Sequence, residues 1–256
     1  MRILLAGPIV WAAVCAATPP VEVRIVYDNT AARASLHADW GFAAVVDVSG
    51  NRILFDAGAE GAILLRNLSA MEVDPASITH AVISHRHPDH RNGLFTLALK
   101  NRSMKTYFLD SFPAELYELA AAVALDPVRV REPVEIAPRV YSTGIVPGEP
   151  DEQALIVETA GGPVILAGCG HPGIVSMVEA ALRQRGAGRV RLLAGGFHLL
   201  RQSDDLIRQT IERLRELGVE QVAPAHCTGE RALELFRRAF GPRFLPAGAG
   251  RRFLIE

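Results

Sequence analysis

The chain has few cysteines, almost no lysine and no surplus of charge of either sign. Three cysteines in 256 residues are too few for a disulfide scaffold. Arginine supplies nearly all of the positive charge, because lysine occurs only as Lys100 and Lys105, and the formal net charge is −1. This balance excludes binding to nucleic acid or to an anionic membrane through bulk charge.

Long hydrophobic runs are also missing. The apolar run that follows Arg2 is about fifteen residues long, which is too short for a membrane span. Small residues follow it, so we expect a signal peptide over 1–17, an exported (periplasmic or secreted) protein and no stable membrane anchor after cleavage. The alternatives are a misassigned start, which would leave the protein cytoplasmic, and a buried N-terminal strand.

What is present is ordinary globular composition, with 49% hydrophobic and 21% charged residues, which excludes a disordered or fibrous chain. From residue 22 onward short β-rich runs alternate with amphipathic segments, and no repeat or long linker interrupts 22–256. The sequence therefore predicts one mixed α/β domain over 22–256. Strands are predicted at 21–28, 42–48, 51–58, 78–84, 104–109, 139–143, 153–159, 163–168 and 220–225.

Helix signals are clearest in the last third of the chain. Pro172 is suited to the first position of one helix, and Ser203 caps another that Gly218 ends. Thr228 is predicted to cap a last helix that stops before Pro242. Earlier in the chain, a helix is predicted through 94–99.

The strongest motif is Ser84-His-Arg-His-Pro-Asp-His90, directly after a predicted strand. His85, His87, Asp89 and His90 place four metal-binding side chains within six residues. Imidazole and carboxylate together suit zinc, iron or manganese rather than calcium or magnesium. The alternative is a solvated histidine-rich loop with adventitious metal affinity.

The pattern His85-x-His87-x-Asp89-His90 resembles the signature of the metallo-β-lactamase superfamily, and Ile53–Gly58 resembles another of its motifs. The resemblance implies an α/β fold of the α+β type, a four-layer αββα sandwich with a binuclear metal site. It also implies that Asp56 supports the metal-binding loop from behind the ligands.

Five further segments resemble one subgroup, typified by the 7,8-dihydropterin-6-yl-methyl-4-(β-D-ribofuranosyl)aminobenzene 5′-phosphate synthases. In chain order they are Tyr27–Asn29, Asp151–Leu155, Gly168–Gly173, Gly195–His198 and His226–Gly229. The chain departs from this subgroup at Arg86, at Pro88 and at Asp39-Trp40, where members commonly carry an acidic residue and a histidine. Arg86 either favours an anionic substrate or is simply solvated.

The resemblance implies that His85 and His87 bind a first metal ion and that Asp89, His90 and His226 bind a second. The region 142–144, where the superfamily has a further histidine, contains none. We therefore predict His171 as the third ligand of the first ion.

Cys169 stands at the position of the bridging aspartate and is either a thiolate ligand or a pocket residue. A disulfide between Cys169 and Cys227 is an alternative that would compete with a metal role. His198 is predicted to protonate a leaving group or to hold an oxyanion, and Asp28 and Asn29 either line the pocket or form a turn. His37 and His80 receive no role.

Together these residues predict a metal-dependent hydrolase, in which a hydroxide held by two divalent ions attacks an ester, phosphoester or lactone. Asp89 would orient the nucleophile, and zinc is favoured over iron or manganese. The substrate is expected to be a small molecule rather than a nucleic acid, and the oligomeric state stays open. The alternatives are a transferase that condenses a pterin pyrophosphate with an aryl ribofuranosyl phosphate, and a non-catalytic relative that binds metal or ligand.

Overall fold

The computed structural model describes residues 19–256, and over this range the strands form one sheet of seven and one of six. The predicted signal peptide, residues 1–17, lies outside the described residues. Between residues 19 and 256, no helix has both the length and the apolar character that a membrane crossing requires.

The first sheet combines antiparallel and parallel pairs. Its strands are β1 (Val21–Tyr27), β2 (Ala43–Val48), β3 (Asn51–Phe55), β4 (His80–Val82), β5 (Lys105–Leu109), β6 (Val128–Val130) and β13 (Arg252–Ile255). Their spatial order is β13-β1-β2-β3-β4-β5-β6. Strands β3 to β6 run parallel, so their carboxyl ends share one edge of the sheet.

In the second sheet the strands lie side by side in the same order in which they follow one another along the chain. The strands are β7 (Val134–Ala137), β8 (Val140–Ser142), β9 (Leu155–Val157), β10 (Val164–Ala167), β11 (Val190–Gly196) and β12 (Val219–Ala225). Their order is β12-β11-β10-β9-β8-β7, with β10, β11 and β12 parallel. This sheet too therefore has three strands that end at one edge.

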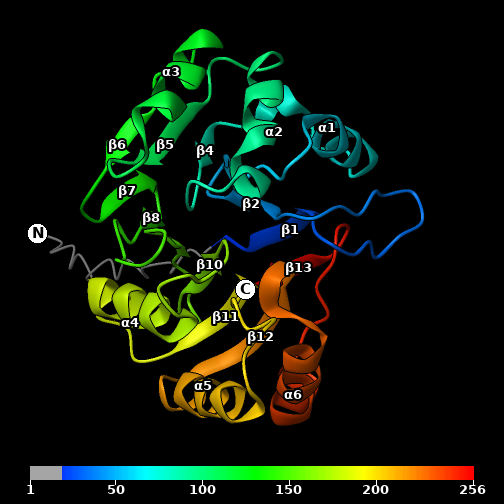
Figure 1. Cartoon of the computed structure of the whole chain (residues 1–256), viewed down its shortest axis with the longest axis vertical. Coiled ribbons are helices and arrows are strands. Elements are labelled where there is room, and N and C mark those ends of the chain that lie inside the picture. The colour runs from blue at the N-terminus through cyan, green and yellow to red at the C-terminus, as the bar shows by residue number, and fades with distance from the viewer. Residues whose placement is uncertain (1–18) are drawn as a thin grey trace, which may run out of the picture.

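Helices cover the outer faces of both sheets. They are α1 (Gly61–Ala70), α2 (Pro88–Ala98), α3 (Ala114–Ala122), α4 (Ile174–Arg185), α5 (Asp204–Glu216) and α6 (Glu230–Phe240), with 3₁₀ turns at Pro75–Ser77, His226–Thr228 and Gly241–Arg243. Figure 1 shows α1, α2 and α3 on the side of the first sheet and α4, α5 and α6 on the side of the second. The predicted αββα sandwich is confirmed.

Strand β10 shows how the sequence builds these layers. Val164 and Leu166 are fully buried in the apolar core between the sheets, whereas Ile165 and Ala167 are buried in the core under α4 to α6. Because successive side chains of a strand point to opposite faces, a strand covered on both sides must be apolar throughout. This explains the unbroken hydrophobic run 163–167.

Several predicted boundaries shift in the structure. The last helix begins after Gly229, not Thr228, because the Thr228 hydroxyl donates to the Ala225 carbonyl and accepts from the Phe197 amide. Helix α4 begins after Gly173, so Pro172 lies outside it. The cap of α5 is confirmed, since the Ser203 hydroxyl accepts from the Leu206 amide at 3.3 Å.

Some elements were not predicted at all. They are α1, α3, β6, β7, β11 and β13. The strand predicted at 51–58 ends at Phe55, because Asp56 takes a left-handed backbone conformation with φ of 59° and the chain turns there.

Candidate metal centre

The predicted ligands follow the carboxyl ends of strands from both sheets. His85 lies after β4, Cys169 and His171 lie after β10, and His226 follows β12 directly. In sheets with parallel strands, ligands bind where the carboxyl ends meet. The edge shared by the two sheets therefore carries the candidate site.

The histidine motif ends as a helix rather than as a loop. His87 is the last residue before α2, and Pro88 occupies the first helical position, where its missing N–H costs nothing. Asp89 and His90 thus belong to the first turn of α2, and the Asp89 carboxylate lies at the positive end of the helix dipole. The helix predicted through 94–99 is correct in type but starts earlier.

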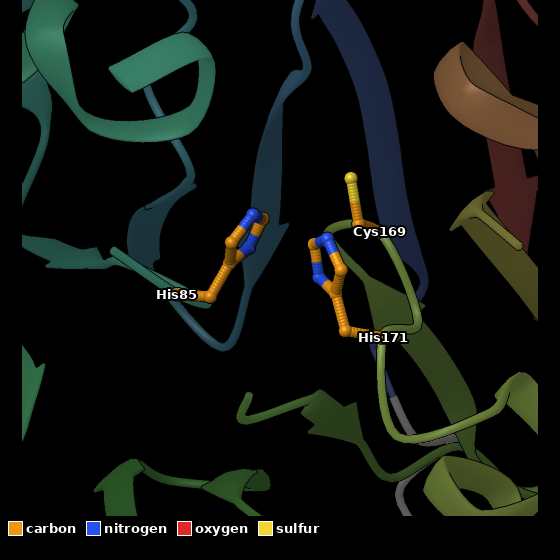
Figure 2. A group of neighbouring side chains, drawn as sticks. All are labelled: His85, Cys169 and His171. Carbon is orange, nitrogen blue, oxygen red and sulfur yellow. The ribbon is translucent and has the colours of Figure 1, made fainter. Parts of the chain in front are cut away.

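Three imidazoles form a first donor group. The ring centres of His85 and His171 are 4.5 Å apart, and the ring of His87 lies 4.8 Å from each of them. Figure 2 shows His85 on one side of the site, and His171 and Cys169 on the loop opposite. The structure therefore brings the three residues predicted for the first ion together.

A carboxylate and two imidazoles form a second donor group. Nε2 of His90 is 3.1 Å from Nε2 of His226, and Asp89 Oδ2 is 3.3 Å from Nε2 of His226. Despite burial, the hydrogen bond from His226 and the nearby His90 hold the pKa of Asp89 well below its usual range. Asp89 is therefore a carboxylate and not an acid at neutral pH.

Cys169 lies between the two groups. Its Sγ is 3.2 Å from Nε2 of His90. Donor atoms of His85, Cys169 and His171 lie within 4.8 Å of one another, and the same holds for His90, Cys169 and His226. The thiol thus occupies the place from which one side chain could contact ions in both groups.

The chemistry of the donor set fits a metal. Nε2 of His85 is buried and has no hydrogen-bond partner among the described residues, while its Nδ1 lies 2.8 Å from the Ser84 hydroxyl. An unpaired polar atom in a protein interior is costly. Burial also lowers the pKa of His85 well below 6.5, which keeps the imidazole neutral, the form that binds a metal.

The Asp56 side chain fixes the histidine motif through hydrogen bonds to Ser84 and His90. Its carboxylate is fully buried, accepts from the amide and hydroxyl of Ser84, and is 2.7 Å from Nδ1 of His90. Although burial disfavours the charged imidazole, the Asp56 carboxylate raises the pKa of His90. Asp56 thereby fixes the ring so that Nε2 faces the site.

Glu152 plays the same part for the opposite loop, and sequence reasoning gave it no role. Its buried carboxylate accepts from the backbone amides of the turn after β10, and its Oε2 is 3.1 Å from Nδ1 of His171. The amides belong to Gly168, Cys169, Gly170 and His171. The only signal was its place in the segment Asp151–Leu155, one of the subgroup motifs.

Asp28 and Asn29 hold His226. The Asp28 carboxylate accepts from the His226 amide at 2.9 Å, and Oδ1 of Asn29 is 2.9 Å from Nδ1 of His226. Both residues also line a cavity of about 380 Å³ beside that histidine. They therefore combine a place on the cavity wall with the orientation of a donor.

Three residues of the site have strained backbone conformations. Asp56, His198 and His226 all take left-handed conformations, with φ of 59°, 53° and 48°. Such conformations cost on the order of 1 kcal/mol or more for residues other than glycine, and they persist where the surroundings impose them. The placement of these three side chains therefore lowers the stability of the folded state.

Comparison with known proteins agrees with this geometry. The protein-family model described as "Metallo-beta-lactamase superfamily" matches residues 41–226. The chain belongs to this superfamily. Its members bind divalent metals such as zinc, and membership makes the protein an enzyme of the metallo-β-lactamase fold.

Two relatives are similar over most of the chain. One is the 7,8-dihydropterin-6-methyl-4-(β-D-ribofuranosyl)-aminobenzene-5′-phosphate synthase of Methanocaldococcus jannaschii, with 28% identity over 82% of this chain and 88% of the relative. The crystal structure of Tm1679, titled a metal-dependent hydrolase of the β-lactamase superfamily, has a TM-score of 0.75 and 28% identity, and the match covers 91% and 98% of the two chains.

A more distant structure shows the fold alone. Zinc-bound PqqB from Methylobacterium extorquens has a TM-score of 0.58 and 16% identity, over 91% of this chain and 99% of that chain. The subgroup resemblance drawn from the sequence is confirmed by the match to the synthase.

In this metallo-β-lactamase-fold chain a third cluster adjoins the metal donors. Donor atoms of Cys169, His198 and Cys227 lie within 4.8 Å of one another, and the His198 ring is 4.5 Å from that of His171. Both cysteines are free thiols, and the disulfide considered from the sequence is not formed. A hydrogen bond with Cys227, together with burial, raises the pKa of the Cys169 thiol.

His198 is the exposed member of this cluster. The hydrogen bond with Cys227 raises the pKa of His198, although burial acts in the opposite direction. The imidazole lines two cavities, of about 310 Å³ and about 320 Å³, that open beside the metal donors. It therefore lies where a molecule bound in either cavity would contact it.

Proposed function

We propose that the protein is a metal-dependent hydrolase that acts on an ester, phosphoester or lactone through a site for two divalent ions, most suitably zinc. The observation that carries the proposal is the pair of donor groups joined by Cys169. His85, His87 and His171 would hold one ion, Asp89, His90 and His226 the other, and Cys169 would contact both. A set of imidazoles, carboxylate and thiolate suits zinc.

When bound, two such ions would activate water and polarise the carbonyl or phosphoryl oxygen of the substrate. The chain's own residues supply the rest. The ionised Asp89 can accept a hydrogen bond from the attacking water and so orient it. His198, whose pKa is raised, can donate a proton to the departing oxygen from the cavity side.

Metal-dependent turnover tests the proposal. We would remove metal with a chelator, restore zinc, manganese or iron, and assay a panel of phosphoesters, lactones and carboxylic esters. His87→Ala should lower turnover by several orders of magnitude. His80→Ala is the matched control, since His80 lies on β4, contacts Thr79 and takes no part in the donor groups.

Loss of turnover in both histidine variants, or full activity in His87→Ala, would contradict the proposal. Turnover that survives complete removal of metal would contradict it as well.

The match to the Methanocaldococcus jannaschii synthase supports a second candidate, a transferase that condenses a pterin pyrophosphate with an aryl ribofuranosyl phosphate. The two reactions differ in what leaves. A transferase releases pyrophosphate from the pterin diphosphate only when the aryl acceptor is present, whereas a hydrolase needs no acceptor. Acceptor-dependent release of pyrophosphate would therefore favour the transferase.

A further inference from the structure

Two large apolar side chains lie exposed beside the metal centre. Trp40 is 49% exposed and Leu200 is 52% exposed. Both border the cavity of about 320 Å³, which His198 and Cys227 also line, and the exposed Arg201 and Gln202 complete its wall. The cavity thus joins an apolar surface directly to the cluster that contains Cys169.

The same two side chains also border the cavity of about 380 Å³ on the side of His226. They therefore form an apolar ridge shared by the two cavities, of which the larger also borders the metal donor His226. Large apolar groups held in water cost free energy unless a partner covers them, and those that line a concave site usually meet a ligand.

The Trp40 ring is held in place. Its centre lies 4.8 Å from that of the His226 ring at a tilt of 58°. The preceding residue, Asp39, accepts a hydrogen bond from the Tyr27 hydroxyl at 2.5 Å. The following residue, Gly41, donates its amide hydrogen to Oδ1 of Asn29. Gly41 also packs closely on the Asp89 backbone, since a Cβ at this position would come within 2.4 Å of the Asp89 carbonyl oxygen.

The backbone at Leu200 is fixed as well, because its amide donates to the Cys227 carbonyl at 3.2 Å. An apolar wall that is rigid before binding costs less to order than a flexible one. A flat ring next to an indole prefers an offset or edge-to-face contact, which an alkyl chain cannot make.

We propose that Trp40 and Leu200 bind a flat aromatic group of the substrate, carried next to the bond that is cleaved. This inference rests on the proposed hydrolase function and narrows its substrates to esters or phosphoesters that carry an aryl group next to the bond that is cleaved.

The test compares substrates that share one leaving group. We would measure kcat/KM, as methanol released, for methyl phenyl phosphate and dimethyl phosphate, and for methyl benzoate and methyl acetate. The ratio of aryl to methyl substrate should fall about tenfold in Trp40→Ala. It should fall in Leu200→Ala and be retained in Trp40→Phe, which keeps a ring.

Leu119→Ala is the matched control, because Leu119 is 48% exposed but lies on α3 and lines none of these cavities. It should leave the ratio unchanged. Comparing the ratio between variants removes the difference in intrinsic reactivity of the substrates.

Binding gives a readout that is independent of turnover. The chain has two tryptophans, so in a Trp11→Phe background the fluorescence reports Trp40 alone. We expect phenylphosphonate to quench this fluorescence in the zinc-loaded protein at about tenfold lower concentration than methylphosphonate.

Hydrolysis of the panel with an equal preference for aryl and methyl groups, unchanged in Trp40→Ala, would overturn the inference and leave the hydrolase intact. Preferential binding of phenylphosphonate without hydrolysis of any substrate would uphold the inference and contradict the hydrolase. A change of oligomeric state in Trp40→Ala with no change in ligand preference would assign the ridge to a subunit contact instead, against the inference.

Discussion

Glu152 lies buried under the turn that carries His171, with Oε2 of the carboxylate 3.1 Å from Nδ1 of the imidazole. The same carboxylate accepts amides from four consecutive residues of the turn. Burial alone would raise the pKa of Glu152, but the bonds from His171 and the amides outweigh it and lower the pKa. Glu152 therefore acts as a fixed negative charge that orients one donor and shapes the turn around another.

Replacement of this charge should weaken metal binding without changing the ligands. In Glu152→Gln the amide side chain cannot accept all of these bonds, so His171 loses its fixed orientation. Loss of a partner that orients a ligand lowers metal affinity about 10–100-fold. Competition with a chromophoric zinc chelator measures the change. Glu158→Gln is the control, since Glu158 pairs with Arg185 at the surface, and it should bind zinc as the wild type does.

The same residue predicts a pH dependence of the metal-free protein. The pKa of Glu152 is lowered from 4.5, so the folded state binds its proton more weakly than the unfolded state. The stabilisation is present above about pH 4.5 and is lost as the pH falls through the lower, folded pKa. The difference in melting temperature between wild type and Glu152→Gln should shrink between pH 7 and pH 3. A constant difference would show that the charge contributes nothing.

Cys169 should leave a spectroscopic trace. If the thiolate contacts the bound ions, cobalt-substituted protein should show a thiolate-to-cobalt charge-transfer band in the near ultraviolet. The band should vanish in Cys169→Ser and persist in Cys227→Ser. Cys169→Asp restores a carboxylate at this position and should keep both ions while losing the band. A band that survives in Cys169→Ser would exclude this thiol as a ligand.

The core between the sheets sets the stability of the scaffold. Leu166 is fully buried there, so Leu166→Ala should lower the free energy of unfolding by about 2–5 kcal/mol through lost burial and the cavity left behind. Leu254→Ala on β13 should change it by less than about 0.5 kcal/mol, because Leu254 is 70% exposed. Equilibrium urea unfolding of both variants measures the difference.

The sequence predicted the donors because their residue types are concentrated. Ser84–His90 carries four of them within six residues, and His171 and His226 stand in distinctive glycine-containing segments. The fold class followed from the same motifs. The hydrogen bonds of the Glu152 carboxylate could not be predicted, because most of their donors are backbone amides, which any sequence provides. The contact of Trp40 with His226 joins residues far apart in the chain and leaves no local pattern.

The missed elements lack the usual end signals. Helices α1 and α3 begin after Glu60 and Pro113, and neither residue makes a side-chain capping hydrogen bond. Strands β6, β7 and β13 have only three or four residues each, too few for a clear alternation, and their pairing partners define them. Thr228 was predicted to cap a helix because threonine is a common capping residue. In the structure its hydroxyl instead forms hydrogen bonds with the backbone of Phe197, after β11, and of Ala225, at the end of β12.

The most direct measurement is the number of metal ions per chain, by elemental mass spectrometry, on protein purified without a metal-affinity column. We predict about two divalent ions per chain in the wild type, and about one in His171→Ala, which removes a donor from the first group only. One ion or fewer in the wild type, or two in the double variant His87→Ala and His171→Ala, would contradict a binuclear centre built on these two groups.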